Sequence, residues 1–306
     1  MGRNLRPVAL GVALALAGPG AAQIAGDGAT LRGRIAFSRG EDIWTSNLDG
    51  GGARRLTRGA GPEDDPSWAP DGSRLAYRDS RRGYNVADEI YVINADGSER
   101  RNLSRTRGND WGPAWSPDGK LIAFNSSYEL HVIRPDGSGM RRVTAAAGEY
   151  PAWSPDGKRL AFMCPGQGGR RTDPNYDICV VNLNGSRLKR ITSWKGEDGW
   201  PAWSPDGRWI AYSTTQDDEG QFEGVGPYKT IYVMRPDGSA KRRVVRRIWA
   251  STPAWSPDSR LILFNGSSLK RFDEERLWIA RRDGSGLRRL SVSGVSADWL
   301  GLPKKR

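Results

Sequence analysis

The chain has 306 residues, a formal net charge of +12 and a hydrophobic content of only 37%. Its 13 tryptophans argue against disorder, because disordered chains are poor in aromatic residues, and it also holds 39 glycines and 19 prolines. The same composition favours many short strands joined by tight turns. The single histidine, His131, limits most catalytic schemes, since no second histidine could serve as a base.

The N-terminus predicts an exported protein. Arg3 and Arg6 precede an apolar run at 7–18, and small residues at 20–22 precede Gln23. The run is too short to span a bilayer, which needs about 20 residues in a helix. Because this arrangement is typical of a cleavable signal peptide, we expect one at residues 1–22. The mature chain is then periplasmic or secreted and has no membrane span.

One repeat fills the rest of the chain. The sequence Pro-Ala-Trp-Ser-Pro-Asp-Gly, hereafter the frame, occurs at 113–119, 151–157 and 201–207, with looser copies at 66–72 and 253–259. After each frame come a run such as Ile-Ala-Phe, a run such as Asp-Ile-Tyr-Val, an Asp-Gly or Asn-Gly turn, and a short basic run. Four such runs predict four antiparallel strands, a to d, with Pro-Asp-Gly as a turn closed by a left-handed glycine. The length of one repeat is close to that of a propeller blade, which has about 40–45 residues.

The two ends of the chain determine the number of blades. Residues 34–38, 42–47 and 54–57 supply strands b, c and d without a strand a, and residues 296–300 supply a strand a with nothing after it. Joining them makes a sixth blade and closes the ring without open sheet edges. The predicted fold is therefore all-β: a six-bladed propeller of four-stranded antiparallel blades, spanning residues 31–302. A short segment at 23–30 precedes it and a basic tail at 303–306 follows it.

These repeated motifs (W-S-P-D-G, I-A-F/Y, D/E-I-Y-V and D-G-S) resemble the WD40-like, or PD40, repeat of the TolB-like propellers over almost the whole mature chain. The true WD40 signature is absent, since no Trp is followed by Asp. The resemblance implies a propeller that binds peptides and proteins. Because few residues separate the predicted signal peptide from the first strand, we expect the propeller without the N-terminal α/β domain of TolB.

The candidate binding site is the face that carries the loops between strands b and c. These loops (79–88, 164–176, 213–229 and 265–275) hold most of the length variation, and insertions on one face of a repeat protein often mark its binding face. The segments that lead into strand a on that face are acidic, and acids around one opening attract cationic ligands. The alternative is that these residues only cap strand ends. The candidate residues are Glu63, Asp64, Asp65, Asp110, Trp111, Glu149, Tyr150, Glu197, Asp198, Trp200 and Asp298.

Two functions fit these features. The first is a non-catalytic scaffold that captures a peptide or protein of the cell envelope at an acidic channel mouth. The second is an enzyme that resembles the propeller uronate lyases or hydrolases and uses channel carboxylates and a metal. We expect no enzyme, no catalytic residue, no cofactor and no metal, because His131 stands where other repeats carry a packed aromatic and no Gly-x-Ser-x-Gly motif occurs.

The excess positive charge has a simple explanation. Each strand d opens with a basic pair, and Lys and Arg on outer strands discourage edge-to-edge aggregation. Nucleic-acid binders instead gather their charge in one patch, so we expect no nucleic acid partner. Electrostatic contact with an anionic envelope stays possible, and the chain is expected to be a monomer. The pairs are Arg54-Arg55, Arg100-Arg101, Arg141-Arg142, Lys189-Arg190, Arg242-Arg243 and Arg288-Arg289.

The only two cysteines, Cys164 and Cys179, flank one b–c loop on adjacent antiparallel strands. An exported chain matures in an oxidising compartment, which favours a disulfide between them. The alternative is a pair of small buried side chains, with Cys179 in the place of a packed aromatic.

Overall fold

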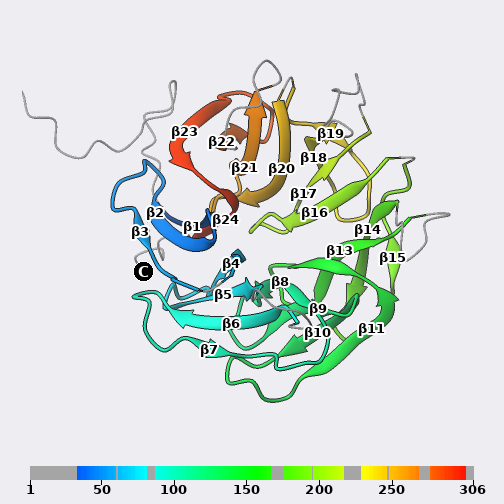
Figure 1. The fold of residues 1–306 in the computed structure, drawn as a ribbon. Helices are drawn as coiled ribbons and strands as arrows, with labels where there is room; N and C mark the ends of the chain where they lie inside the picture. The colour runs from blue at the N-terminus through cyan, green and yellow to red at the C-terminus, as the bar shows by residue number, and fades with distance from the viewer. Residues whose placement is uncertain are drawn as a thin grey trace, which may run out of the picture.

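The structure is a computed structural model that describes residues 33–59, 61–80, 87–166, 175–194, 196–216, 229–246, 248–268 and 276–300. It contains six four-stranded antiparallel sheets arranged as blades around a central axis (Figure 1). This confirms the predicted all-β, six-bladed propeller. The predicted signal peptide, the segment at 23–30, the tail at 303–306 and most of the long b–c loops lie outside the described residues, so the domain limits stay predictions.

Each blade follows the predicted order of strands a to d. The first blade consists of β24 (Val295–Leu300), β1 (Arg34–Arg39), β2 (Asp42–Asn47) and β3 (Arg54–Arg55). The second consists of β4 (Glu63–Trp68), β5 (Arg74–Asp79), β6 (Glu89–Asn94) and β7 (Arg101–Asn102). The third consists of β8 (Asp110–Trp115), β9 (Ile122–Ser126), β10 (Glu129–Ile133) and β11 (Arg141–Ala147).

The remaining blades repeat this order. The fourth consists of β12 (Glu149–Trp153), β13 (Arg159–Pro165), β14 (Tyr176–Asn182) and β15 (Lys189–Arg190). The fifth consists of β16 (Asp198–Trp203), β17 (Ile210–Thr214), β18 (Thr230–Met234) and β19 (Arg242–Arg243). The sixth consists of β20 (Ile248–Trp255), β21 (Leu261–Ser268), β22 (Arg276–Arg281) and β23 (Arg288–Ser293).

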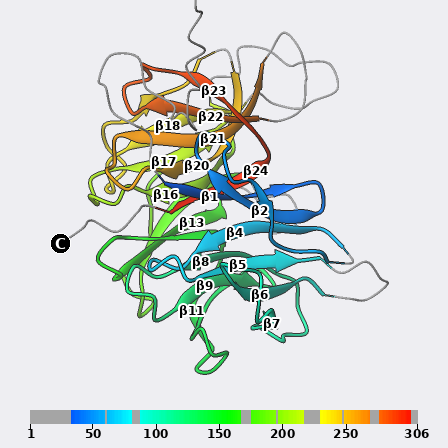
Figure 2. The same cartoon turned by 90° about the vertical axis from the view of Figure 1, so that its left-hand side faces the viewer.

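The ring closes through the C-terminal strand, as predicted. β24 pairs antiparallel with β1, with Leu300 opposite Arg34 and Trp299 opposite Ile35. Trp299 is 8% exposed and packs in a cluster that includes Ile35 from β1 and Leu263 from β21. The two ends of the chain therefore share one blade, which Figure 2 shows as the red β24 lying beside the blue β1.

The core lies between neighbouring blades. The aromatic residues of the b strands are almost completely buried, and the frame tryptophans are also buried. Two of these tryptophans also bond to the preceding blade: the indole N–H of Trp153 donates to the carbonyl of Ala114 (2.9 Å), and that of Trp255 to the carbonyl of Ala202 (3.0 Å). Burying large aromatic groups between sheets supplies most of the hydrophobic stabilisation of such a fold.

The turns after the frames are nearly identical. In the third blade the Ser116 hydroxyl donates to the Asp118 carboxylate and accepts the N–H of Leu121 at 2.9 Å, while Gly119 has a φ of 70°. The same serine–aspartate pair closes the turns at Asp156, Asp206 and Asp258. The left-handed glycine of the predicted turn is therefore present, although Ser259 takes its place in the last frame with a φ of 61°.

The basic pairs at the rim join the blades together. One residue of a pair donates to a carbonyl in the c–d turn of the next blade, as Arg141 does to Leu183 (3.2 Å) and Arg242 to Arg282 (2.7 Å). In the pair Arg100-Arg101 this residue is the second one, Arg101, which donates to the carbonyl of Pro135. The second residue of several pairs turns back to an acid of its own blade, as in the Arg55–Asp42 ion pair at 2.8 Å. These arginines have a structural role that their exposure alone does not suggest.

Cys164 in β13 and Cys179 in β14 form a disulfide, with their Cα atoms 5.8 Å apart. The described residues contain no helix of the length and apolarity that a membrane crossing requires.

Candidate functional site: the central channel

Each of the six inner strands carries a β-bulge at the same place, just before its frame or, in β24, before Ala297. The pairing with strand b shifts there, for example between Asp64 and Ser67 in β4. A bulge re-aims a side chain, and one residue of each bulge has a left-handed backbone that is rare for residues other than glycine. We call these six residues the bulge ring: Asp65, Gly112, Tyr150, Trp200, Thr252 and Ser296, with φ values of 51°, 62°, 49°, 49°, 48° and 49°.

The bulge ring surrounds the narrow section of the central channel, a cavity of about 130 Å³. A wider section of about 650 Å³ lies on the side of the a–b turns and is lined mainly by the prolines, alanines and tryptophans of the frames. The two sections share as lining residues Pro66, Pro113, Pro151, Pro201, Pro253 and Ala297. These residues therefore form the waist of the channel.

Asp65 is the acid of the bulge ring. Burial raises the pKa of its carboxyl to about 7, and repulsion from Asp64 adds to the shift, whereas Arg78, the Ser296 hydroxyl and the Gly112 backbone act in the opposite direction. One of its carboxylate oxygens, Oδ2, is buried without a hydrogen-bond partner. Since a buried acceptor without a partner is costly, this oxygen offers an unused acceptor in the narrow section.

Tyr150 and Trp200 form an aromatic wall in the same section. Their ring centroids are 5.7 Å apart and their planes are tilted by 47°. The Lys229 ammonium lies 4.2 Å from the centre of the Trp200 ring and 3.0 Å from the Glu197 carboxylate. The wall therefore already holds one cation by a cation–π contact, so Lys229 occupies one face of the Trp200 ring.

Asp64 is neutralised by a neighbour on β5. Its two carboxylate oxygens accept hydrogen bonds from the Arg78 guanidinium, one of them at 2.6 Å from Nε. The side chains of Asp64 and Arg78 are 26% and 24% exposed. The pair is therefore a half-buried ion pair beside the ring, and Asp64 is not a free acceptor for a ligand.

Three of the predicted acids are buried inside the blades. Glu63, Asp110 and Asp198 are 1%, 0% and 0% exposed. Burial raises the pKa of each of these carboxyls. The pKa of Asp198 reaches about 6, although hydrogen bonds with the Thr214 and Thr192 hydroxyls act to lower it. Each of these acids lies three residues before a proline of the waist (Pro66, Pro113 and Pro201), and its side chain turns into the blade.

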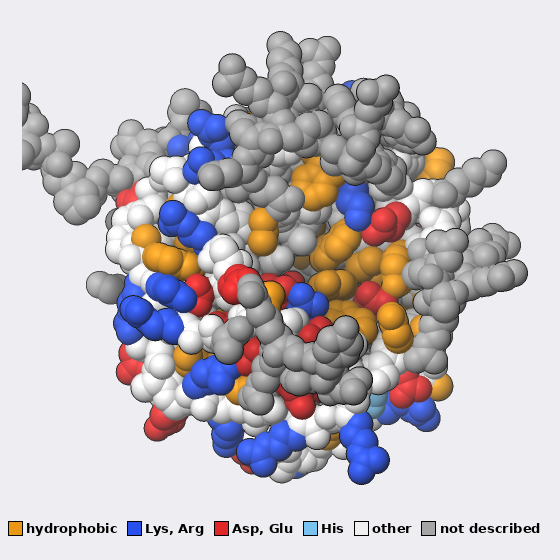
Figure 3. Space-filling model, in the orientation of Figure 1, with side chains coloured by type: hydrophobic (Ala, Val, Ile, Leu, Met, Phe, Trp, Pro, Cys, Tyr) orange, Lys and Arg blue, Asp and Glu red, His pale blue; other side chains and the backbone are white. Residues whose placement is uncertain are grey.

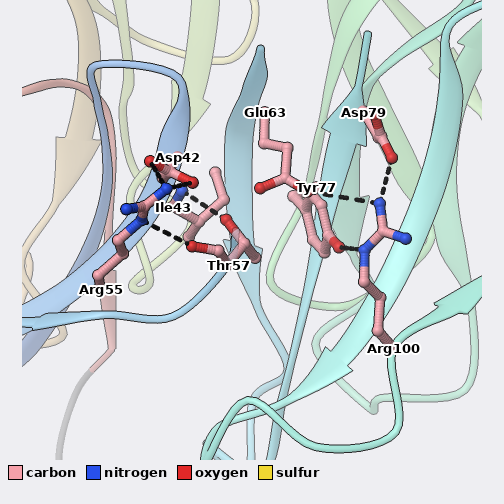
Figure 4. A network of polar contacts seen from close by, with 8 residues as sticks. All are labelled: Asp42, Ile43, Arg55, Thr57, Glu63, Tyr77, Asp79 and Arg100. Carbon is pink, nitrogen blue, oxygen red and sulfur yellow. Dashed lines mark hydrogen bonds and ion pairs between the residues drawn. The ribbon is translucent and has the colours of Figure 1, made fainter. Parts of the chain in front are cut away.

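Glu63 belongs to a charged network in the second blade (Figure 4). The Arg100 guanidinium donates to the Tyr77 hydroxyl at 2.7 Å, pairs with Asp79, and lies 3.4 Å from the Glu63 carboxylate. Tyr77 is fully buried, and Arg100 also stacks 4.0 Å from the centre of the Tyr91 ring. This network uses the carboxylate of Glu63 for packing the blade.

The other predicted residues also have partners in the fold. Glu149 accepts a hydrogen bond from the Tyr176 hydroxyl, and burial raises the pKa of its carboxyl. Trp111 packs edge-on against Tyr128, with ring centroids 5.3 Å apart. Asp298 lines the wide section of the channel, where it accepts the backbone N–H groups of Trp68 (2.7 Å) and Trp299 (2.8 Å) and so ties β24 to β4.

The structure therefore brings Asp65, Tyr150 and Trp200 together on the narrow section and places Asp298 on the wide one. The remaining predicted residues are not among those that line either section. Sequence reasoning missed Gly112, Thr252 and Ser296. The signal for them was available: the position just before the frame is occupied by a different residue in every blade.

Comparisons with known proteins agree with this architecture. Residues 29–132 match the model of the Tricorn protease N-terminal beta propeller domain. The solved structure of TolB from Acinetobacter baumannii superposes with a TM-score of 0.71 at 21% identity, covering 87% of this chain and 66% of that one. A putative TolB from Agrobacterium tumefaciens gives 0.66 at 20% identity, covering 90% and 100%. The fold is that of the TolB-like propellers.

A weaker likeness to an enzyme is also present. The oligogalacturonate lyase of Vibrio parahaemolyticus superposes on this TolB-like propeller with a TM-score of 0.53 at 14% identity, covering 84% of this chain and 73% of that one. No curated protein sequence matches the chain. The chain spans 66% of the length of the Acinetobacter TolB, so the likeness concerns the propeller alone.

The TolB-like propeller places its one histidine away from the channel residues. His131 lies on β10, where its Nδ1 is 3.1 Å from the carbonyl of Glu129 and its ring is 5.9 Å from that of Phe124. Within the described ranges, no group of three or more His, Cys, Asp or Glu side chains is arranged to hold a metal ion.

Proposed function

We propose that the chain is an exported, non-catalytic binding scaffold that captures a peptide or protein of the cell envelope at the central channel. The observation that carries this proposal is the buried, unpartnered oxygen of Asp65 beside the Tyr150–Trp200 wall. An acceptor and aromatic faces around one small cavity suit a cationic group. The TolB-like fold supports the proposal, since it is consistent with a binding scaffold.

The size of the cavity limits what can enter. A volume of about 130 Å³ accepts one head group, such as a lysine ammonium or an N-terminal ammonium, but no folded element. The rest of the partner would lie on the face around the opening. Figure 3 shows acidic and hydrophobic side chains gathered near the middle of the face in view, with most Lys and Arg toward its edge. This distribution favours a ligand that carries positive charge at its inserted end.

The protonation state of Asp65 sets a pH dependence for this capture. Its carboxyl has a pKa of about 7, so it is largely neutral at pH 6 and largely ionised at pH 8. A cationic group binds the ionised form more strongly. We therefore expect affinity for a cationic peptide to increase as the pH rises from 6 to 8.

The direct test is calorimetric titration of the purified protein with a short lysine peptide and with a glutamate peptide of the same length. Asp65→Asn should weaken lysine-peptide binding at least about 10-fold, the cost of losing a charged hydrogen bond. Asp71→Asn is the matched control, because Asp71 is an exposed acid in an a–b turn. Equal affinities for the wild type and both variants, with unchanged melting, would rule out capture at Asp65.

The alternative is a propeller enzyme of the uronate-lyase type. The structural likeness to oligogalacturonate lyase is the observation that favours it. Such chemistry would require a metal held by channel carboxylates. Metal analysis of the purified protein, together with an assay for unsaturated products from oligogalacturonate, separates the two proposals. A stoichiometric divalent metal with lyase activity would favour the enzyme.

A further inference from the structure

A positively charged groove lies between the fourth and fifth blades, away from the channel. It has a volume of about 560 Å³, and its walls carry Arg159, Arg187 and Lys189 from the fourth blade and Arg235 from the fifth. Its lining also includes Val180 and Ile191, which are each 7% exposed and form an apolar floor. The groove thus combines four cations with buried hydrocarbon.

These cations are available to a ligand. None of the four takes part in an ion pair with another of the described residues. The only acid in the lining is Asp237, whose carboxylate accepts the N–H of Ser239 at 2.9 Å. Four positive charges against one negative charge leave an uncompensated field that attracts anions.

Three of the cations are already oriented. The Arg159 guanidinium lies 4.9 Å from the centre of the Trp203 ring, and that of Arg235 lies 4.5 Å from the Trp209 ring. The Lys189 ammonium donates to the carbonyl of Asp237 at 3.4 Å. Side chains that are held before binding lose less conformational entropy when a ligand arrives.

Arg187 occupies a backbone position that suits glycine. Its φ is 54°, and the matching c–d turn positions of the other blades are also left-handed. A side chain there is strained relative to glycine, and strained residues of this kind cluster at functional sites. The matching residues are Gly52, Glu99, Gly139, Ala240 and Gly286, so only this blade places a cation there.

We propose that this groove binds an acidic peptide segment of a partner protein. Carboxylates of the segment pair with the guanidinium groups of Arg159, Arg187 and Arg235, which are suited to two parallel hydrogen bonds with a carboxylate. An apolar side chain of the segment packs on Val180 and Ile191. A peptide fits better than an isolated phosphate, because the groove holds about 560 Å³ and combines four cations with an apolar floor.

The test is fluorescence anisotropy of the full chain with a labelled peptide of alternating glutamate and leucine. Arg187→Glu should weaken binding at least about 10-fold, with a reduced salt dependence. Lys120→Glu makes the same charge change at a side chain that is 81% exposed and distant in sequence from the groove, and it should change affinity less than about twofold. Arg187→Gly should weaken binding while raising the melting temperature, which separates a ligand contact from a structural role.

The second and third blades provide a test of sufficiency. In the repeat, Arg74, Arg101 and Arg134 stand at the places of Arg159, Lys189 and Arg235, but Glu99 stands at the place of Arg187. Glu99→Arg should therefore create a second site and raise the stoichiometry from one peptide to two.

Two results would overturn the proposal. One is unchanged peptide affinity in Arg187→Glu. The other is competition by inorganic phosphate or by phosphatidylglycerol vesicles that is stronger than competition by unlabelled peptide, which would point to a phosphate ligand. Asp65→Asn should leave binding of the acidic peptide unchanged, so the outcome here is independent of the channel proposal.

Discussion

The two sections of the central channel are built from the same six strands, yet their side chains follow opposite rules. On the wide section nearly every blade presents the same proline, alanine and tryptophan residues of its frame, and the tryptophans pack between blades. On the narrow section the six backbones agree in φ, but the side chains are all different: Asp65, Gly112, Tyr150, Trp200, Thr252 and Ser296. In a repeat protein, identity between repeats is expected where the fold requires a residue, and the variation at the strained, equivalent positions of the narrow section supports the binding role that we propose for it.

The largest expected effect on stability concerns closure of the ring through β24. Deleting Ser296 onward removes most of β24, whose Trp299 packs beside Ile35 and whose Asp298 binds the N–H of Trp68. The first blade then loses its inner strand and neighbouring edges are exposed. We expect an insoluble protein or one without a cooperative melt in calorimetry. A truncated chain that melts like the full chain would contradict closure through β24.

Two tryptophans of β16 provide a matched pair for the comparison. Trp203 is 7% exposed in the interblade core, whereas Trp200 is half-buried on the narrow section. Trp203→Ala should cost about 3–5 kcal/mol of unfolding free energy, while Trp200→Ala should cost about 1 kcal/mol and weaken ligand capture. Denaturant unfolding and peptide titration measure both effects. Similar losses of stability in the two variants would remove the distinction between the two sections.

The same contrast explains what sequence reasoning could predict. The repeated sequence motifs predict the strand order, the number of blades, the turn type and closure by residues 296–300. The channel acids were chosen by charge, and an inner strand directs alternate residues to opposite sides. Asp110 and Asp198 lie inside the blades, while Asp65 reaches the channel because a bulge re-aims it. A bulge depends on pairing between strands, which charge and composition do not reveal.

The bulge ring can be tested through its backbone. Thr252 is β-branched at a φ of 48°, an unfavourable combination, so Thr252→Gly should stabilise the protein by about 1 kcal/mol. Gly112→Ala is the opposite experiment, because a Cβ there would lie 3.2 Å from the Cα of Tyr150. It should cost about 1–2 kcal/mol. If both variants shift the thermal midpoint in the same direction, the six positions do not share the left-handed geometry.

The smallest expected effect on stability comes from the ionisation of Asp65, which destabilises the folded chain as the pH rises. The pKa of its carboxyl is about 7 in the folded chain, raised mainly by burial from 3.8. Between those values the folded state binds more protons than the unfolded state, so the contribution of this group to stability decreases as the pH rises. A pKa raised from 3.8 to about 7 corresponds to at most about 4 kcal/mol, and solvent screening at this half-buried residue lowers the effect to about 1 kcal/mol.

Asp65→Asn removes this proton uptake while keeping the shape of the side chain. The variant should therefore gain about 1 kcal/mol over the wild type at pH 8, and the gain should decrease toward pH 5, where the wild-type carboxyl is mostly neutral. Urea unfolding at both pH values measures the difference. Asp71→Asn should show no such trend, because hydrogen bonds from Ser73 hold the pKa of the Asp71 carboxyl below its usual value of 3.8, and the group is ionised in both the folded and unfolded states at both pH values. A gain from Asp65→Asn that is equal at pH 5 and pH 8 would mean that the carboxyl is ionised throughout, and the pH dependence expected for ligand capture would then be lost as well.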